Sequence, residues 1–180
     1  ISAGAHSSQD HLDRVTEISY SNGQSIAYTY DENGNQTVRD DSVHGVTGYD
    51  YDKLNRRTGE TYPSSVTNAY GYDDAGNMTS LTDAGGTVSY AYDDANLVSS
   101  LTEPGSLTTS FGYDARDNRT AKTLPNGVVE TTTYDTSDKP KVIEAKKGAT
   151  TLSKFTYAYQ KSSNETAQRQ SVTDKASNTT

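Results

Sequence analysis

The residues best suited to chemistry are carboxylates that recur at a fixed interval. Each follows a tyrosine, in Tyr-Asp dipeptides at 30–31, 51–52, 72–73, 92–93, 113–114 and 134–135. Aligned carboxylates could form a ladder that binds a cation, since Ca²⁺ takes carboxylate oxygens as ligands. Alternatively, each Asp accepts a bond from a backbone N–H two residues on, as in an Asx-turn. We favour the turn, because the loops after Asp31 and Asp73 lack the bidentate Glu that completes a calcium loop.

Aromatic rings form a second recurring set. In most repeats another ring stands two residues before the Tyr of the dipeptide, and residues two apart on a strand share a face. Such rings could bind sugars or apolar segments, because each has an apolar face and a polar tip. They could equally pack the sheet as cross-strand pairs. The candidate ligand-contact or wall-packing aromatics are Tyr28, Tyr30, Tyr49, Tyr51, Tyr70, Tyr72, Tyr90, Tyr92, Phe111, Tyr113 and Tyr134.

Other catalytic or metal-binding groups do not assemble in the sequence. Cysteine is absent, which excludes a thiol nucleophile, a disulfide scaffold and a cysteine-based metal site. His6 and His11 lie in a polar run, and His44 lies in a predicted turn. Adjacent carboxylates such as Asp40 and Asp41 would face opposite ways on a strand, whereas catalytic pairs must face each other. We predict no catalytic residue, no metal site and no cofactor, so the chain is not expected to be an enzyme.

Composition argues against several further classes of protein and partner. The 180 residues are 31% hydrophobic and contain no apolar run near the roughly 20 residues that a membrane-spanning helix needs. The formal charge of −8 argues against nucleic acid as a partner. No apolar signal-peptide segment is visible before Arg14. Four Asn-x-Thr sequences fall on the same repeat columns, where turn chemistry accounts for them without glycans.

The spacing of the dipeptides establishes a tandem repeat. The six dipeptides are 20 or 21 residues apart. Degenerate copies lie at Gln9-Asp10, 21 residues before Tyr30, and at Tyr159-Gln160, 25 residues after Tyr134. We therefore expect about eight repeats over residues 1–170, and a polar tail or the cut edge of a larger array at 171–180.

Each repeat contains two turn signals. Four residues after the Tyr comes Gly, Asn or Asp, all of which tolerate a left-handed backbone. A second signal, such as Asn22-Gly23 or Asn126-Gly127, lies near the middle of the repeat. Seven residues after the Tyr a Thr or Ser usually marks the resumed strand. The predicted turn-forming residues are Asp31, Gly34, Asp52, Asn55, Asp73, Gly76, Asp93, Asn96, Asp114 and Asp117.

Two turns in 21 residues leave two short strands, so the repeat unit is a β-hairpin. The prediction is an all-β fold, a long antiparallel meander of about 14–16 strands. Sheet twist makes a flat ribbon of this length improbable, and we expect a curved strip with the Tyr pairs on one face. Aliphatic residues are few, so the strip is expected to need further repeats to complete its core.

The Tyr-Thr-Tyr-Asp-Glu-Asn-Gly-Asn sequence at 28–35 resembles the RHS, or YD-repeat, family, and so do 51–58 and 70–79. The family includes bacterial Rhs and wall-associated polymorphic toxins, toxin-complex C components and teneurins. The resemblance implies a strip that spirals into a shell, which encloses an effector in the toxins and forms part of an adhesion ectodomain in teneurins. The chain contains no Asp-Pro dipeptide, which the toxins carry at the end of the shell, and no candidate toxin domain. It therefore resembles an interior piece of an array.

The resulting hypothesis is a non-catalytic segment of a β-shell that encloses or presents a toxin or adhesion domain in a large secreted or surface protein. Its partners would be further repeats of the same polypeptide or copies of itself, and the enclosed domain. One alternative is a carbohydrate-binding or adhesion module that uses the Tyr rows on glycans. Another is a filament in which strips add through unpaired strand edges.

Overall fold

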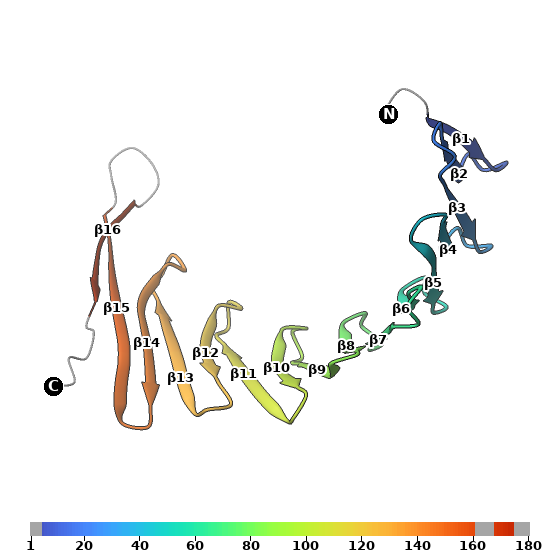
Figure 1. Ribbon diagram of the computed structural model, residues 1–180. Coiled ribbons are helices and arrows are strands. Elements are labelled where there is room, and N and C mark those ends of the chain that lie inside the picture. Colours follow the sequence, from blue (N-terminus) through green and yellow to red (C-terminus); the bar gives the residue numbers. More distant parts are fainter. Residues whose placement is uncertain (1–4, 161–167, 175–180) are drawn as a thin grey trace. The chain divides into compact units, whose positions relative to one another are not determined.

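A computed structural model describes residues 5–160 and the backbone of 168–174 (Figure 1). The chain divides into two compact units, Ile1–Val88 and Ser89–Thr180, with the boundary inside one strand. The described residues form strands and turns. They contain no helix, and so no membrane-spanning helix. The strands are β1 Ala5–Gln9, β2 Val15–Tyr20, β3 Ser25–Tyr30, β4 Gln36–Asp41, β5 Gly45–Tyr51, β6 Arg57–Thr61, β7 Thr67–Tyr72, β8 Met78–Asp83, β9 Gly86–Tyr92, β10 Val98–Glu103, β11 Leu107–Tyr113, β12 Arg119–Thr123, β13 Val128–Tyr134, β14 Pro140–Lys147, β15 Thr150–Gln160 and β16 Gln168–Asp174.

Within each unit every strand pairs antiparallel with the next strand of the sequence. Strands β1 to β8 pair in this order in the first unit, and β9 to β16 do so in the second. The predicted all-β meander of hairpin repeats is confirmed. Strand β16 extends to Asp174, so the segment at 171–180 begins inside a strand, and residues 175–180 lie outside the described residues.

A β-bulge recurs at every Tyr-Asp hairpin and at the degenerate first copy, and two further irregularities lie between β14 and β15 and between β15 and β16. Tyr30 pairs with Gln36 and Thr29 pairs with Val38, so Thr37 has no partner across the ladder. The same skip occurs at each Tyr-Asp hairpin and always falls seven residues after the Tyr. The sequence predicted that the Thr or Ser at this position is an ordinary strand residue where the strand resumes. It is instead the extra residue of a bulge, which bends its strand and increases the local twist. The bulge residues are Thr16, Thr37, Thr58, Thr79, Ser99, Thr120 and Lys141.

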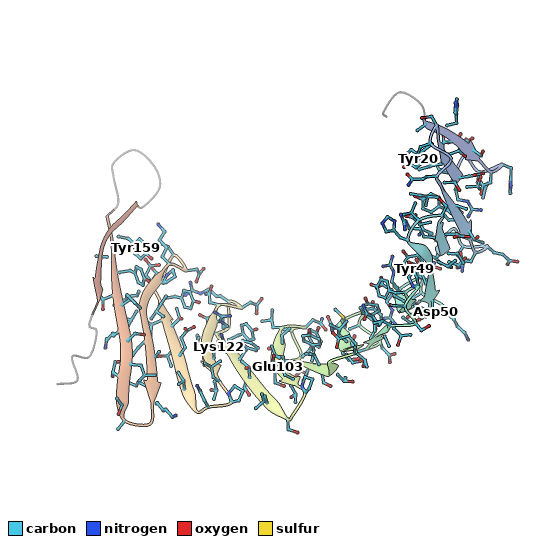
Figure 2. The ribbon with its side chains drawn as sticks, in the orientation of Figure 1. Tyr20, Tyr49, Asp50, Glu103, Lys122 and Tyr159 are labelled. Carbon is cyan, nitrogen blue, oxygen red and sulfur yellow. The ribbon has the colours of Figure 1, made fainter. Side chains whose placement is uncertain are left out.

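The two faces of the sheet differ in burial. Side chains alternate along a strand, so Tyr49 and its neighbour Asp50 project from opposite sides of β5 (Figure 2). The face that carries the Tyr columns, here called the tyrosine face, is half-buried by its own neighbours, whereas Ala27, Asp40 and Asp50 on the opposite face are exposed. No apolar side chain is buried in the described part of the chain. Neither unit therefore has a hydrophobic core of its own.

The turns of each unit lie alternately on two edges. One edge, the Tyr-Asp turn edge, carries the turns at 10–14, 31–35, 52–56 and 73–77 in the first unit and at 93–97, 114–118 and 135–139 in the second. The other, the mid-repeat turn edge, carries the turns at 21–24, 42–44, 62–66 and 84–85, and then at 104–106, 124–127 and 148–149. Three of these turns directly follow a carboxylate at the end of a strand, namely Asp41, Asp83 and Glu103.

A residue with left-handed backbone closes each Tyr-Asp turn. The strain that a side chain would suffer in this conformation can be measured at Gly76. This residue has a φ of +94°, and an added Cβ would meet no atom within 4 Å. We expect Gly76→Ala to lower the free energy of unfolding by about 1–2 kcal/mol through backbone strain alone. Gly48→Ala is the matched control, since its space is equally open and its φ is ordinary. That variant is expected to be neutral or stabilising by up to about 1 kcal/mol in urea denaturation.

Candidate functional site: the tyrosine face

The second Tyr of each pair connects its hairpin to the preceding one. The Tyr51 hydroxyl donates to the carbonyl oxygen of Gln36 at 2.9 Å, and the Tyr72 hydroxyl donates to that of Arg57 at 2.9 Å. In each case the acceptor is the first residue of the preceding even-numbered strand, which itself pairs with the previous Tyr. The same bond is made by Tyr30 to Val15, Tyr113 to Val98, Tyr134 to Arg119 and Tyr159 to Pro140. These tyrosine hydroxyls, here called the hydroxyl row, therefore link each hairpin to the one before it.

Cations stack on these rings from the neighbouring turn. The guanidinium carbon of Arg56 lies 4.6 Å from the centroid of Tyr72, and Arg14 lies 4.6 Å from Tyr30. Arg56 also donates from Nη1 to the carbonyl oxygen of Asp73 at 2.8 Å. In the second unit Lys139 lies 5.5 Å from the Tyr159 ring. One turn is thus bound both to the ring and to the backbone of the next repeat.

The recurring Asp residues accept hydrogen bonds within their own turns. Oδ1 of Asp52 accepts the backbone N–H groups of Leu54 at 2.9 Å and Arg56 at 3.0 Å, and Oδ2 accepts Nε of Arg56 at 2.7 Å. The geometry recurs with Asn at the fifth position, where Asn35 Nδ2 donates to Asp31 Oδ2 at 2.9 Å. Backbone N–H donors lower the pKa of Asp52, first among them that of Arg56. The carboxylate oxygens serve these turns, and the described residues contain no cluster of three or more His, Asp or Glu that could hold a metal ion.

The residues four positions after the Tyr have the left-handed backbone that closes these turns. Gly34 and Gly76 have φ values of +88° and +94°. The non-glycine residues of the column take the same region, with φ of 61° at Asn55, 61° at Asn96 and 63° at Asp117. The turn around Asp10 in the degenerate first copy has the same form, with a φ of 59° at Asp13.

A buried carboxylate on β6 organises the centre of the face in the first unit. Glu60 is only 8% exposed and lies opposite Tyr49 in the ladder. Its Oε2 accepts the hydroxyls of Tyr62 at 2.5 Å and Tyr70 at 3.2 Å, and its Oε1 pairs with Arg57. The Arg57 guanidinium lies 4.6 Å above the Tyr49 ring. The Tyr62 hydroxyl is the largest influence that lowers the pKa of Glu60, and burial of the carboxylate opposes it.

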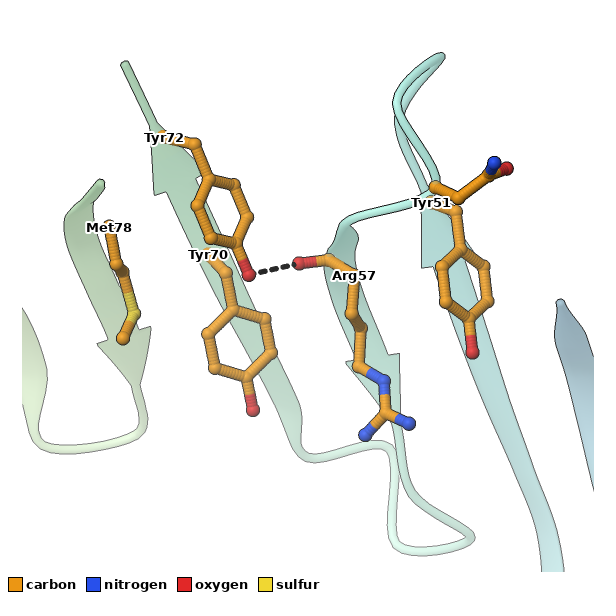
Figure 3. A pocket seen from close by; sticks show the side chains of 6 residues that line it. Tyr51, Arg57, Tyr70, Tyr72 and Met78 are labelled. Atoms are coloured by element: carbon orange, nitrogen blue, oxygen red, sulfur yellow. Dashed lines mark hydrogen bonds between the residues drawn. The ribbon is translucent and has the colours of Figure 1, made fainter. Parts of the chain in front are cut away.

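An open hollow of about 460 Å³ lies beside this cluster (Figure 3). The rings of Tyr70 and Tyr72 stand on β7 beside Arg57 on β6, and the hydroxyl of Tyr72 donates to the Arg57 carbonyl oxygen. Three phenol rings, one cation and a thioether therefore surround a space large enough for a sugar ring or an amino-acid side chain. Its lining is Tyr51, Asn55, Arg57, Tyr70, Tyr72 and Met78.

A family model of the RHS repeat matches residues 10–45, 64–88, 72–108 and 92–129, which together make up more than half of the chain. The chain belongs to the RHS repeat family. No curated protein sequence matches it.

Solved structures share the fold of these RHS repeats at low sequence identity. The crystal structure of TcdB2-TccC3-TEV is 15% identical over 98% of this chain, with a TM-score of 0.65. A structure of the Photorhabdus luminescens Tc holotoxin pore with a mutated TccC3 is 16% identical over 99% of this chain, with a TM-score of 0.60. The chain spans only 12% of the length of each of these relatives.

The structure brings the candidate aromatics together in each unit and adds residues that the repeat pattern did not mark. Tyr28, Tyr30, Tyr49, Tyr51, Tyr70 and Tyr72 lie half-buried on the tyrosine face of the first unit, and Tyr90, Tyr92, Phe111, Tyr113 and Tyr134 on that of the second. Glu60 and Tyr62 were missed, because neither of them stands in a repeating column. Met78 was missed although it follows a turn at a fixed place, since that column varies in residue type.

The hydroxyl row of the RHS repeats can be tested at one position. We expect Tyr51→Phe to lower the free energy of unfolding by about 1 kcal/mol, because it removes the bond to Gln36 and leaves the ring in place. Tyr49→Phe is the control, since the ring that stacks under Arg57 is kept, and it should cost less than about 0.5 kcal/mol. Equal losses in urea denaturation would contradict a special role for the second Tyr.

Proposed function

We propose that the chain is a non-catalytic wall segment of a larger RHS-type protein, in which the strip forms part of a shell that encloses or presents another domain. The observation that carries the proposal is the combination of an unbroken antiparallel ladder within each unit with the absence of any buried apolar side chain in the described residues. Such a one-layer sheet can form a wall and can be extended by further equal repeats. Because it has no core of its own, its faces must pack against other parts of the protein.

Two features of the repeat suit a wall. Backbone groups pair from strand to strand, and the hydroxyl of the second Tyr of a pair donates to the backbone of the previous hairpin, so further repeats can be added through the same contacts. The low share of the relatives' length that this chain spans supports a role as one stretch of a long array. By analogy with TcdB2-TccC3 and the Tc holotoxin, the enclosed domain would be a toxin, and the protein would act outside the cell that makes it.

The decisive experiment images the complete natural polypeptide. Electron microscopy of the purified protein should show a hollow particle with density inside, and limited proteolysis should leave the enclosed segment intact while the particle is folded. Fibres would support the filament alternative, because unpaired strand edges add end to end. A solid particle whose segments are all cleaved as fast as in urea would contradict enclosure.

The hollow beside Arg57 favours carbohydrate binding as a second candidate function. Three tyrosine rings with a cation and an amide at the rim offer both stacking surface and hydrogen-bonding groups to a sugar. Tyr70→Ala should abolish binding in a glycan array, whereas Tyr28→Ala removes a ring of the same column that does not line the hollow and should leave binding intact. Absence of binding to any glycan by the unaltered chain would reject this candidate.

A further inference from the structure

Three asparagines of the chain are followed by glycine, at Asn22-Gly23, Asn33-Gly34 and Asn126-Gly127, and all three dipeptides are exposed. In such a dipeptide the backbone nitrogen of the second residue can attack the side-chain carbonyl carbon of the Asn. A cyclic imide forms, ammonia leaves, and water opens the imide to Asp or isoaspartate. Glycine favours the attack, because it has no Cβ to hinder the approach or to restrict the backbone.

The three dipeptides lie in backbone turns of the same form. In each turn Asn is the third residue and Gly the fourth, and the Gly N–H donates to the carbonyl oxygen of the first residue. The donor–acceptor distances are 3.0 Å for Gly23, 3.1 Å for Gly34 and 2.9 Å for Gly127. The φ values of these glycines are +84°, +88° and +80°. Because the attacking nitrogen is held alike in the three turns, a difference in reactivity must come from the Asn side chain.

The two mid-repeat turns restrain the Asn side chain. Oδ1 of Asn22 accepts the backbone N–H of Gln24 at 3.1 Å, and its Nδ2 donates to Oε1 of Gln24 at 2.8 Å. Oδ1 of Asn126 likewise accepts the backbone N–H of Val128 at 3.1 Å. In both turns the Asn therefore binds the N–H of the fifth residue, and rotation of the carboxamide toward the attacking nitrogen costs that bond.

The Tyr-Asp turn leaves its Asn unrestrained. Oδ1 of Asp31 accepts the backbone N–H groups of Asn33 at 3.0 Å and Asn35 at 2.8 Å, so the carboxylate binds the fifth residue in place of the carboxamide. The Asn33 carboxamide makes no hydrogen bond within the described part of the chain. Leu12 and Leu54, which hold the same third position in two other Tyr-Asp turns, are 60% and 66% exposed, so this position points into solvent.

We propose that Asn33 is a site of spontaneous modification and the most reactive of the three asparagines. The nitrogen of Gly34 bonds to Cγ of Asn33 as the bond from Cγ to Nδ2 breaks, and the proton of the Gly34 N–H leaves with Nδ2 as ammonia. One water molecule, the only co-reactant, then opens the imide to a carboxylic acid and an amide. The Asp of the Tyr-Asp dipeptide is the cause, because it takes the hydrogen bond that restrains the Asn in the other turns. The reaction does not depend on what the strip encloses.

The product loosens the turn in which it forms. Isoaspartate carries the main chain through Cβ and Cγ, which lengthens it between two N–H groups, those of Asn33 and Asn35, that bind one oxygen of Asp31. Nδ2 of Asn35 also donates to Oδ1 of Asn55 at 2.7 Å, and this bond joins the turn to the next Tyr-Asp turn. Modification at Asn33 therefore weakens the link between two repeats.

Peptide mass spectrometry of the folded chain, aged in mildly alkaline buffer, tests the proposal without any substitution. We expect Asn33 to convert about 5-fold faster than Asn22 or Asn126, the rate ratio that corresponds to one hydrogen bond. In urea the three rates should converge, since the dipeptide is the same. Isoaspartate should be among the products, because direct hydrolysis of the side-chain amide gives Asp alone. Equal rates in the folded chain, the same rate ratio in urea, or a product without isoaspartate would overturn the proposal.

A substitution can transfer the effect to a mid-repeat turn. Leu124 is the first residue of the turn that contains Asn126, the place that Asp31 holds in its own turn. Leu124→Asp should bind the N–H of Val128, release the Asn126 carboxamide and raise its conversion rate about 5-fold. Thr123→Asp adds the same charge one residue earlier and should leave that rate unchanged, and far-UV circular dichroism verifies that both variants are folded. An unchanged rate in folded Leu124→Asp, or equal acceleration by Thr123→Asp, would contradict the role of the Asp.

Discussion

Replacement of Glu60 with alanine is expected to lower the free energy of unfolding by about 3 kcal/mol. The carboxylate is buried and accepts two phenol hydroxyls while it pairs with Arg57. Without it, the donors of Tyr62 and Tyr70 and the Arg57 cation lose their acceptor at the centre of the tyrosine face. The chain has no tryptophan, so the measurement is urea denaturation followed by far-UV circular dichroism.

Two further variants separate charge from shape at this position. Glu60→Gln keeps the size and one acceptor oxygen but loses the negative charge, and should cost about half as much. Glu32→Ala removes an exposed carboxylate in a turn and should change stability by less than about 0.5 kcal/mol. If Glu60→Ala were no more destabilising than Glu32→Ala, the cluster around Glu60 would not contribute to the stability of the face.

The strands and turns were predictable because their causes are local. The Asp at the start of each Tyr-Asp turn bonds N–H groups two and four residues away, and the left-handed position follows within the same loop. Five consecutive residues are therefore enough to reverse the direction of the chain. When the turn recurs every 20 or 21 residues, the antiparallel order of the strands follows without any knowledge of distant contacts.

The register and the centre of the face were not predictable, because their causes lie across strands. Thr37 has the residue type of an ordinary strand position, and only the pairing of Tyr30 with Gln36 makes it the extra residue of a bulge. Glu60 looks like a solvent-facing strand residue by type. Its burial depends on Tyr62 and Tyr70, which are placed by the next turn and the next strand. No single-repeat pattern contains that information.

Acid is expected to unfold the chain cooperatively, and this is the largest effect of the solution conditions. Among the described residues, nine carboxyl groups have a pKa below the ordinary value of 3.8 for Asp or 4.5 for Glu, namely Asp10, Asp31, Asp41, Asp52, Asp73, Asp114, Asp135, Glu60 and Glu144. In most of the Asp turns backbone and Asn or Arg donors within the turn are the cause. A folded pKa below the unfolded one means that the unfolded chain binds more protons in the interval between them.

The sign of the pH dependence follows from that difference. The contribution of these groups is fully present above the unfolded values and is lost as the pH falls through the folded ones. The urea midpoint should therefore be constant between about pH 6 and 8 and fall steeply below about pH 4. The slope of stability against pH in the acid range should correspond to uptake of several protons per molecule, on the order of the number of turns.

Substitution and salt together identify the source of the acid effect. Asp52→Asn keeps an oxygen that can accept the turn N–H groups but cannot titrate, so it should reduce the proton uptake by about one. General repulsion between positive charges at low pH is the competing explanation, and added salt at about 0.5 M screens it while it leaves short hydrogen bonds in place. The acid transition should therefore persist in salt. If salt abolished it, or if Asp52→Asn left the proton uptake unchanged, the turn carboxylates would not be what holds the hairpins together at neutral pH.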